Sequence, residues 1–368
     1  MSASATIATA NRASVSEQSE EQKMVKKVAV SSFLGNFIEW FDYASYSYFA
    51  TTIALVFFPS GNHTVAMLQT FGVFALSFVL RPIGALFWGN FGDKKGRKGA
   101  LAISIMFMSG ASFLIGCLPS YAAIGIFAPA LLLLLRMVQG FSASGEYAGA
   151  ATFLGEYAPT KKRGIYCSLI PASTAIGLLA GSTFATVMTA SLSSDALTSW
   201  GWRIPFLMAG PLGLIVHFIR TKLADSPVYA SMTEALDDKQ QSASTTKSVS
   251  PLHELFQNHF KTLVISFGAC VLNAVGFYTV LTYLPTYLSD TVGMAAAQSS
   301  TITTICLVLY VALVFGMGHI SDMFGRNELI PYTIPKLTAF AFLLCSGVTS
   351  SSGTWNTFDA VMRWISSA

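Results

Sequence analysis

Long apolar blocks recur along this chain and limit the folds open to it. An α-helix needs about 20 residues to cross the hydrocarbon core of a bilayer. Blocks of that order lie at 28–56, 66–90, 99–118, 123–156, 165–190, 204–220, 261–288 and 299–318, with a weaker one at 329–348. Only 11% of the residues are charged, against about 25% in a soluble domain. We predict an all-α integral membrane protein with about nine spans.

Basic residues occupy alternate loops. They lie in the N-terminal tail, after the second, fourth and sixth blocks, and before the seventh. The intervening loops at 57–65, 119–122, 191–201 and 289–298 contain no Lys or Arg. The positive-inside rule then places the N-terminus in the cytoplasm of a multi-pass protein of the cytoplasmic (inner) membrane. Topology accounts for these basic loops, so they do not indicate a nucleic-acid partner.

Composition divides the chain into five parts. We predict a disordered cytoplasmic tail at 1–27, a six-helix bundle at 28–222 and a cytoplasmic linker at 223–259 that is rich in Ser, Thr and charge. An incomplete second bundle follows at 260–348, and an irregular tail occupies 349–368. No positively charged stretch leads into a short apolar core and cleavage site, so the N-terminal tail does not have the pattern of a cleaved signal peptide.

The sequence offers no pattern typical of an enzyme. The five cysteines are scattered without CxxC spacing, and the histidines have no metal-ligand partner at a useful distance along the chain. No nucleophile–base motif, phosphate loop or dinucleotide fingerprint is present. We therefore expect no catalytic site, no metal and no cofactor, and we see no sign of an obligate protein partner.

A short motif occurs twice. The pattern G-x3-D-x2-G-R includes Gly89, Asp93, Gly96 and Arg97, and it recurs 229 residues later with Asp322 and Arg326. Each copy follows the second block of its half, and repeated halves are typical of secondary transporters. We expect the two glycines to let helix ends approach and Asp93 to stand before the third span. Arg97 can pair with Asp93 or with a neighbouring helix end. Both copies are candidate cytoplasmic gates; a solvated basic turn is the alternative.

Five ionisable side chains lie well inside the blocks, where each costs about 2.5–3.5 kcal/mol on insertion scales. Glu39, Asp42 and Glu146 are acidic, and Arg81 and Arg136 are basic. Three carboxylates against two arginines leave one negative charge over, and burial favours the neutral form of such a carboxyl group. We predict that Glu39 or Asp42 carries a proton and that Arg81 is a buried charge partner. The alternative is that these charges only fix helix packing.

The polar residues of two blocks fall on one side of each predicted helix. In the first block, Tyr43 and Tyr46 share a side with the two acids. In the fourth, Arg136, Gln139 and Glu146 lie along one side. A guanidinium suits a carboxylate, and aromatic faces suit a quaternary ammonium. The candidate substrate-binding residues are Arg136, Gln139, Tyr43, Tyr46 and Glu146.

Several stretches resemble one family of transporters. They are "GNFIEWFDY" (35–43), "RPIGALFWGNFGDKKGRK" (81–98), "RMVQGFSASGEYAGAATFLGEYAPTKKRG" (136–164), "WGWRIPF" (200–206), "DSPVY" (225–229) and "FYTVLTYLPTYL" (277–288). Their order is similar to that of the metabolite:proton symporter family within the major facilitator superfamily, particularly its proline/glycine-betaine transporters. This resemblance implies two helical halves, twelve spans in all, around a central cavity. It also implies symport of a small molecule and a proton by alternating access.

The chain departs from that pattern near its end. After Arg326 the family pattern is lost, and a Ser/Gly-rich stretch follows Pro331, Pro335 and Lys336. From this ending we expect truncation, with poor folding or no transport. The leading functional expectation is proton-coupled symport of a small zwitterionic osmolyte such as proline or betaine. The alternatives are an organic-acid symporter of the dicarboxylate or α-ketoglutarate type, and a transport-inactive membrane protein.

Overall fold

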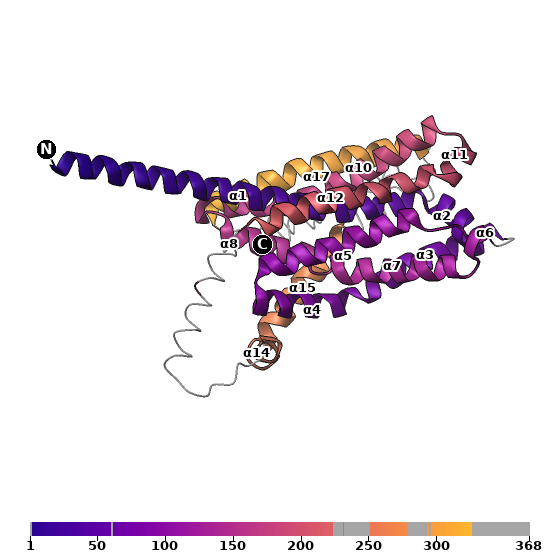
Figure 1. The fold of residues 1–368 in the computed structure, drawn as a ribbon, viewed down its shortest axis with the longest axis horizontal. Helices are drawn as coiled ribbons and strands as arrows, with labels where there is room; N and C mark the ends of the chain where they lie inside the picture. The colour runs from indigo at the N-terminus through magenta and orange to yellow at the C-terminus, as the bar shows by residue number, and fades with distance from the viewer. Residues whose placement is uncertain are drawn as a thin grey trace, which may run out of the picture. The chain divides into compact units, whose positions relative to one another are not determined.

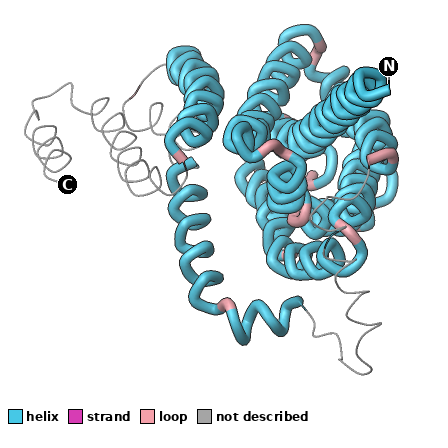
Figure 2. The backbone as a smooth tube through the Cα atoms, turned by 90° about the vertical axis from the view of Figure 1, so that its left-hand side faces the viewer, coloured by secondary structure: helices cyan, strands magenta, loops and turns pink. Residues whose placement is uncertain are grey.

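The structure is a computed structural model that describes residues 2–59, 62–223, 231, 251–277, 293 and 296–325. Every regular element among these residues is a helix (Figure 2). The chain divides into two units, Met1–Leu252 and His253–Ala368, and the division lies inside the predicted linker. The predicted span at 329–348 and the tail at 349–368 fall outside the described residues.

The first unit contains most of the described helices (Figure 1). They are α1 (Ser2–Tyr48), α2 (Ala50–Phe57), α3 (His63–Val79), α4 (Arg81–Lys95), α5 (Arg97–Cys117), α6 (Tyr121–Ile124), α7 (Phe127–Ala143), α8 (Glu146–Tyr157), α9 (Arg163–Cys167), α10 (Leu169–Ser191), α11 (Ser194–Ser199) and α12 (Ile204–Thr221). Two 3₁₀ turns, η1 (Thr160–Lys162) and η2 (Gly201–Arg203), join some of them. The second unit contains α14 (Pro251–Asn258), α15 (Phe260–Phe277) and α17 (Ala296–Phe324).

Six described helical stretches are long and apolar enough to cross a membrane. They are His63–Lys95, Arg97–Cys117, Phe127–Tyr157, Thr160–Ser191, Gly201–Thr221 and Thr304–Phe324. Each overlaps a predicted span, from the second to the sixth and the eighth. The predicted first span falls on α1 and α2, whose polar stripe lowers the mean hydropathy of that segment. The predicted seventh span is described only over α15.

The N-terminal segment differs from the expected disordered tail. Residues 2–27 are helical and continue into the apolar part of α1 without a break. Besides Ser, this segment is rich in Ala, Glu, Gln and Lys, which are among the strongest helix formers. The polarity that suggested disorder is therefore compatible with a helix that elongates from an already formed one.

Two of the membrane stretches are interrupted next to an ionisable residue. Helices α3 and α4 meet at Leu80, where Pro82 follows in the first turn of α4; proline lacks an N–H donor and restricts the residue before it. Helices α7 and α8 meet at Ser144 and Gly145. Each interruption comes next to an ionisable residue, Arg81 in the first case and Glu146 in the second, so both breaks help to place the charges described below.

Candidate functional site

The polar stripe of α1 is buried inside the first unit. Asn36, Glu39, Asp42, Tyr43 and Tyr46 are each at most 6% exposed. Their spacing of three or four residues places them on one side of the helix. On the same helix, Tyr48 is 60% exposed. The predicted polar side of α1 is therefore buried, but Ile38 and Phe41 on other sides of the helix are also only 2% and 6% exposed, so this part of α1 is surrounded by other helices.

Glu39 forms an ion pair with Arg81 at the start of α4. The Glu39 Oε1 and Arg81 Nη2 atoms are 2.6 Å apart. The same guanidinium nitrogen donates to the Tyr43 hydroxyl, and the guanidinium also lies over the rings of Tyr43 and Phe78. The other carboxylate oxygen of Glu39, Oε2, is buried and has no hydrogen-bond partner. Arg81 is thus a charge partner of Glu39, although its side chain is 26% exposed.

Asp42 forms an ion pair with Arg136 of α7. The Asp42 Oδ2 and Arg136 Nη1 atoms are 2.8 Å apart, with side chains 5% and 0% exposed. The guanidinium carbon of Arg136 lies 3.8 Å from the ring centroid of Tyr46. Three buried atoms of this pair, Asp42 Oδ1 and Arg136 Nε and Nη2, lack a hydrogen-bond partner. Because unmade hydrogen bonds are costly in a buried site, these atoms have unused capacity to bind a ligand.

Gln139 lies one turn after Arg136 on the buried side of α7. Its amide nitrogen donates to the Ser112 hydroxyl of α5 at 2.5 Å, and its amide oxygen is buried without a partner. Arg136 therefore offers free donors and Gln139 a free acceptor. Both residues were candidates for substrate binding, and the structure brings them to one buried side of α7.

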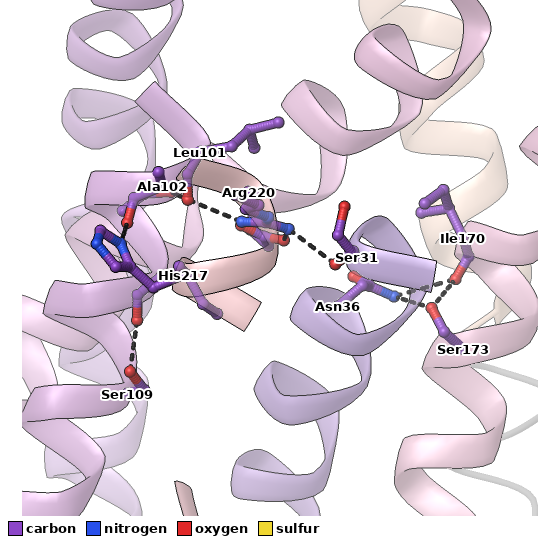
Figure 3. A network of polar contacts seen from close by, with 12 residues as sticks. Ser31, Asn36, Leu101, Ala102, Ser109, Ile170, Ser173, His217 and Arg220 are labelled. Carbon is purple, nitrogen blue, oxygen red and sulfur yellow. Dashed lines mark hydrogen bonds and ion pairs between the residues drawn. The ribbon is translucent and has the colours of Figure 1, made fainter. Parts of the chain in front are cut away.

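Glu146 is paired with a residue that the charge count left out. Both of its carboxylate oxygens accept from the guanidinium of Arg220 on α12, one of them at 2.8 Å. Arg220 also donates to the Leu101 carbonyl of α5 at 2.7 Å and to the Ser31 carbonyl of α1 at 3.2 Å (Figure 3). The two side chains are 1% and 2% exposed. Neither has a buried polar atom without a partner.

The expected surplus of one carboxylate is therefore wrong. Arg220 stands near Lys222 at the end of the sixth span, so its position in the sequence suggested a basic loop. With Arg220 included, three buried carboxylates face three arginines, and the network is neutral. The complete pairing of Glu146 also favours a structural role for that residue over substrate binding.

A separate polar contact holds α1 to α10. The side-chain nitrogen of Asn36 donates to the Ile170 carbonyl and to the hydroxyls of Ser173 and Thr174, over 2.8 to 3.0 Å (Figure 3). On α12, His217 Nδ1 lies 2.8 Å from the Ala102 carbonyl (Figure 3); since a carbonyl only accepts, this nitrogen is the donor. These contacts fix the helices around the charged residues.

The tyrosine rings of the site are occupied by arginines. Tyr43 faces Arg81 and Tyr46 faces Arg136. A quaternary ammonium would have to compete with these guanidinium groups for the same aromatic faces. The first unit therefore offers a substrate hydrogen-bond donors more readily than a free aromatic cage.

The first copy of the repeated motif forms the turn between α4 and α5. Arg97 Nε lies 3.1 Å from Glu156 Oε1 at the end of α8, and Arg97 Nη2 lies 3.7 Å from Asp93 Oδ1. Both expected kinds of partner are present, Asp93 and the end of a neighbouring helix, although the sequence did not name Glu156 as the residue on that helix. An acid at the last residue of the predicted fourth span was the available signal.

Two details of this turn differ from expectation. Asp93 lies in the last turn of α4, not at the N-terminus of α5. A Cβ on Gly89 would have no neighbour within 4 Å, so among the described residues Gly89 makes no close helix contact. Gly96 is required for another reason: its φ is +95°, where residues with a Cβ are strained.

The second copy of the motif repeats this backbone geometry. Helix α17 ends at Phe324, and Gly325 has a φ of +87°. Gly96 donates to the carbonyl of Gly92 and Gly325 to that of Ser321, both four residues back. Asp322 lies in the last turn of α17, as Asp93 does in α4. The two turns are thus alike up to the glycine; Arg326 lies outside the described residues.

Known proteins with similar sequences are transporters. The chain matches the family model described as "Sugar (and other) transporter" over residues 27–362. It is 35% identical over 322 residues to the glycine betaine/proline/ectoine/pipecolic acid transporter OusA of Dickeya dadantii, covering 87% of this chain and 63% of OusA. It is 34% identical over 309 residues to the proline/betaine transporter of Escherichia coli K12, covering 83% of this chain and 61% of that protein.

A third relative is covered more fully. A putative proline/betaine transporter of Staphylococcus aureus is 36% identical over 324 residues, covering 88% of this chain and 68% of the relative. The chain therefore spans between about 61% and 68% of the length of these relatives.

Solved structures of one transporter share the fold. The proton:xylose symporter XylE bound to 6-bromo-6-deoxy-D-glucose superposes with a TM-score of 0.66 at 18% identity, covering 84% of this chain and 71% of XylE. The inward open conformation of XylE from E. coli gives a TM-score of 0.58 at 18% identity, covering 83% and 71%. These similarities confirm the predicted all-helical fold. The chain is a multi-pass membrane protein that belongs to the sugar (and other) transporter family of the major facilitator superfamily.

Proposed function

We propose that this chain takes part in proton-coupled symport of a small zwitterion that carries a carboxylate, such as proline or betaine. The observation that supports this most is the state of Arg136, which is fully buried and has two nitrogen atoms without hydrogen-bond partners. A buried guanidinium with free, parallel donors suits a carboxylate. The relatives are named as transporters of betaine and proline, which agrees with that chemistry.

Charge balance provides a route to coupling. The buried network is neutral before a ligand binds. A zwitterion is neutral as a whole, but its carboxylate at Arg136 would lie next to Asp42, and two carboxylates that share one guanidinium in a region of low dielectric constant repel each other. A proton on one of the protein carboxylates relieves this repulsion. We propose Asp42 as that carboxylate, with Glu39 as the alternative, because Asp42 is already bound to Arg136 Nη1 and would share the guanidinium with the ligand.

The other groups around Asp42 support this assignment. Arg136 faces it from α7, and Glu39, Tyr43 and Tyr46 lie on its own helix. The other two pairs are Glu39–Arg81 and Glu146–Arg220. Helix α10 contains no ionisable residue. Glu146 is paired with Arg220 and does not contact Arg136, so it is not proposed as the coupling group.

The proposal also includes the orientation of the chain in the membrane and the role of its two glycine turns. The basic ends of the spans, including the turn at Gly96, are proposed to face the cytoplasm, with the N-terminus on that side. The turns at Gly96 and Gly325 are proposed as gates whose ion pairs form in one conformation and separate in another, as alternating access requires. An organic-acid symporter is the second candidate, and the occupation of Tyr43 and Tyr46 by arginines favours it over a betaine-specific site.

Transport by the full 368-residue chain in proteoliposomes tests the proposal. We expect an inward proton gradient to drive accumulation of radiolabelled glycine betaine or proline, and a protonophore to abolish it. Accumulation of α-ketoglutarate in their place would support the second candidate. The matched variant is Arg136→Lys, which keeps the charge but loses the parallel donors. Accumulation that is unaffected by this substitution would contradict a role for Arg136 in binding the carboxylate.

A further inference from the structure

Helix α8 is separated from the helix that carries Arg136. Gly145 N donates to the Ser142 carbonyl, three residues back, at 3.4 Å. The Phe141 carbonyl accepts from Trp88 Nε1 of α4 at 3.1 Å and from the Ser144 hydroxyl at 2.6 Å. In an unbroken α-helix, Gly145 N would donate to the Phe141 carbonyl. Here the side chains of Trp88 and Ser144 donate to that carbonyl instead. Because the hydrogen-bond ladder is broken here, α7 does not by itself set the direction of α8.

Each end of α8 is held by an ion pair. At its first residue, Glu146 binds Arg220, whose guanidinium also reaches the Ser31 and Leu101 carbonyls. At its other end, Glu156 binds Arg97 at the turn between α4 and α5. The first pair is at most 2% exposed, whereas in the second Arg97 is 27% and Glu156 15% exposed. The anchor at Glu146 is therefore the more deeply buried one.

The chain leaves room for this anchor. A Cβ on Gly35 of α1 would collide with Glu146 Oε1 and Arg220 Nη2. Glycine at this position lets α1 lie against the ion pair and lets the Ser31 carbonyl, one turn earlier, accept from Arg220. Four helices, α1, α5, α8 and α12, thus meet at Arg220 (Figure 3).

We propose that Arg220 and Glu146 are positioning residues that anchor the start of α8 and thereby present Glu156 to Arg97 at the Gly96 turn. The pair itself binds neither substrate nor proton, since all of its buried polar atoms are already satisfied. Its effect reaches the turn through α8, a helix of 12 residues. The inference concerns the resting geometry of the turn and does not depend on the substrate proposed above.

Pulsed EPR on the full chain tests the inference. Spin labels at Lys95→Cys on α4 and Thr152→Cys on α8, both exposed positions, report the distance between the turn and α8 once the five native cysteines are replaced by serine. The double variant Glu146→Leu/Arg220→Met removes both charges at similar volume, an exchange that buried ion pairs often tolerate. We expect it to give a broader, displaced distance distribution.

Two further variants make the result specific. Asp42→Asn/Arg136→Gln removes a different buried pair and should leave the distribution unchanged, while Glu156→Gln cuts the far anchor and should broaden it. If the first double variant fails to fold, Glu146→Gln replaces it, because the amide removes the charge and one of the two acceptors that bind Arg220; a broader distribution is again expected. A cooperative thermal transition shows that each variant is folded. A distribution in the folded Glu146 variant that superimposes on the parent's, or broadening by the Asp42/Arg136 control, would overturn the inference.

Discussion

Two buried ion pairs in the first unit differ in how completely they are satisfied. Glu146–Arg220 has no buried polar atom without a partner, and Arg220 binds two backbone carbonyls in addition. Asp42–Arg136 is equally buried, yet one oxygen and two nitrogens are unpaired. Satisfied polar networks rigidify a structure, and partly satisfied ones have capacity left for a ligand. The comparison teaches that burial alone does not distinguish a structural charge from a functional one; the remaining hydrogen-bonding capacity does.

The largest expected effect comes from removing one member of the satisfied pair. Glu146→Leu leaves the Arg220 guanidinium buried without a counter-charge, so we expect the free energy of unfolding to fall by about 3–5 kcal/mol. Thermal or denaturant unfolding in detergent micelles measures it. Glu146→Leu/Arg220→Met is the control and should recover most of the loss. Equal stability of the single variant and the parent would show that the pair is not a structural anchor.

A smaller effect is expected where α1 makes room for that pair. Gly35→Ala places a methyl group against the Glu146 carboxylate and the Arg220 guanidinium, and overpacking of this kind costs about 1–3 kcal/mol. The same unfolding assay applies. Gly99→Ala in α5 is matched, since a methyl group added there would meet no atom within 4 Å. If both variants were equally stable, the close approach at Gly35 would be of no consequence.

The smallest effect concerns the break that separates the two pairs along the fourth span. Trp88→Phe removes the indole donor to the Phe141 carbonyl, a loss of about 0.5–1.5 kcal/mol for a neutral hydrogen bond. Trp202→Phe is the comparison, because Trp202 is buried and its indole nitrogen has no hydrogen-bond partner. If Trp202→Phe lowered the unfolding free energy more than Trp88→Phe, the Trp88 hydrogen bond would not explain the break between α7 and α8.

The sequence predicted the fold class because the apolar blocks leave few alternatives. Helical spacing also placed Asn36, Glu39 and Asp42 together on one buried side of α1, although Phe41 on the opposite side is buried as well. The recurrence of the motif was matched by the positive φ of Gly96 and Gly325. These features depend on local spacing, which a sequence displays directly.

The pairing of charges could not be predicted in the same way. Arg220 lies 74 residues from Glu146, and its place near the end of a span made it look like part of a basic loop. Whether an arginine at such a position turns inward depends on tertiary contacts with Ser31 and Leu101. The break at Ser144 and Gly145 was missed for a similar reason, because side chains from α4 contribute to it.

Proton uptake on ligand binding is the most direct test of the distinction between the two ion pairs. In this account Asp42–Arg136 binds the ligand and couples it to a proton, and Glu146–Arg220 is structural. Glycine betaine is added to the full chain in weakly buffered detergent solution, and choline, which lacks the carboxylate, is the control ligand. We predict uptake of about one proton per bound betaine, because the ligand carboxylate shares Arg136 with Asp42, and a like charge nearby favours the neutral form of a buried carboxyl group. Asp42→Asn should abolish this uptake, and Glu146→Leu/Arg220→Met should preserve it. Uptake that survives in Asp42→Asn, or disappears in the Glu146/Arg220 variant, would contradict the account.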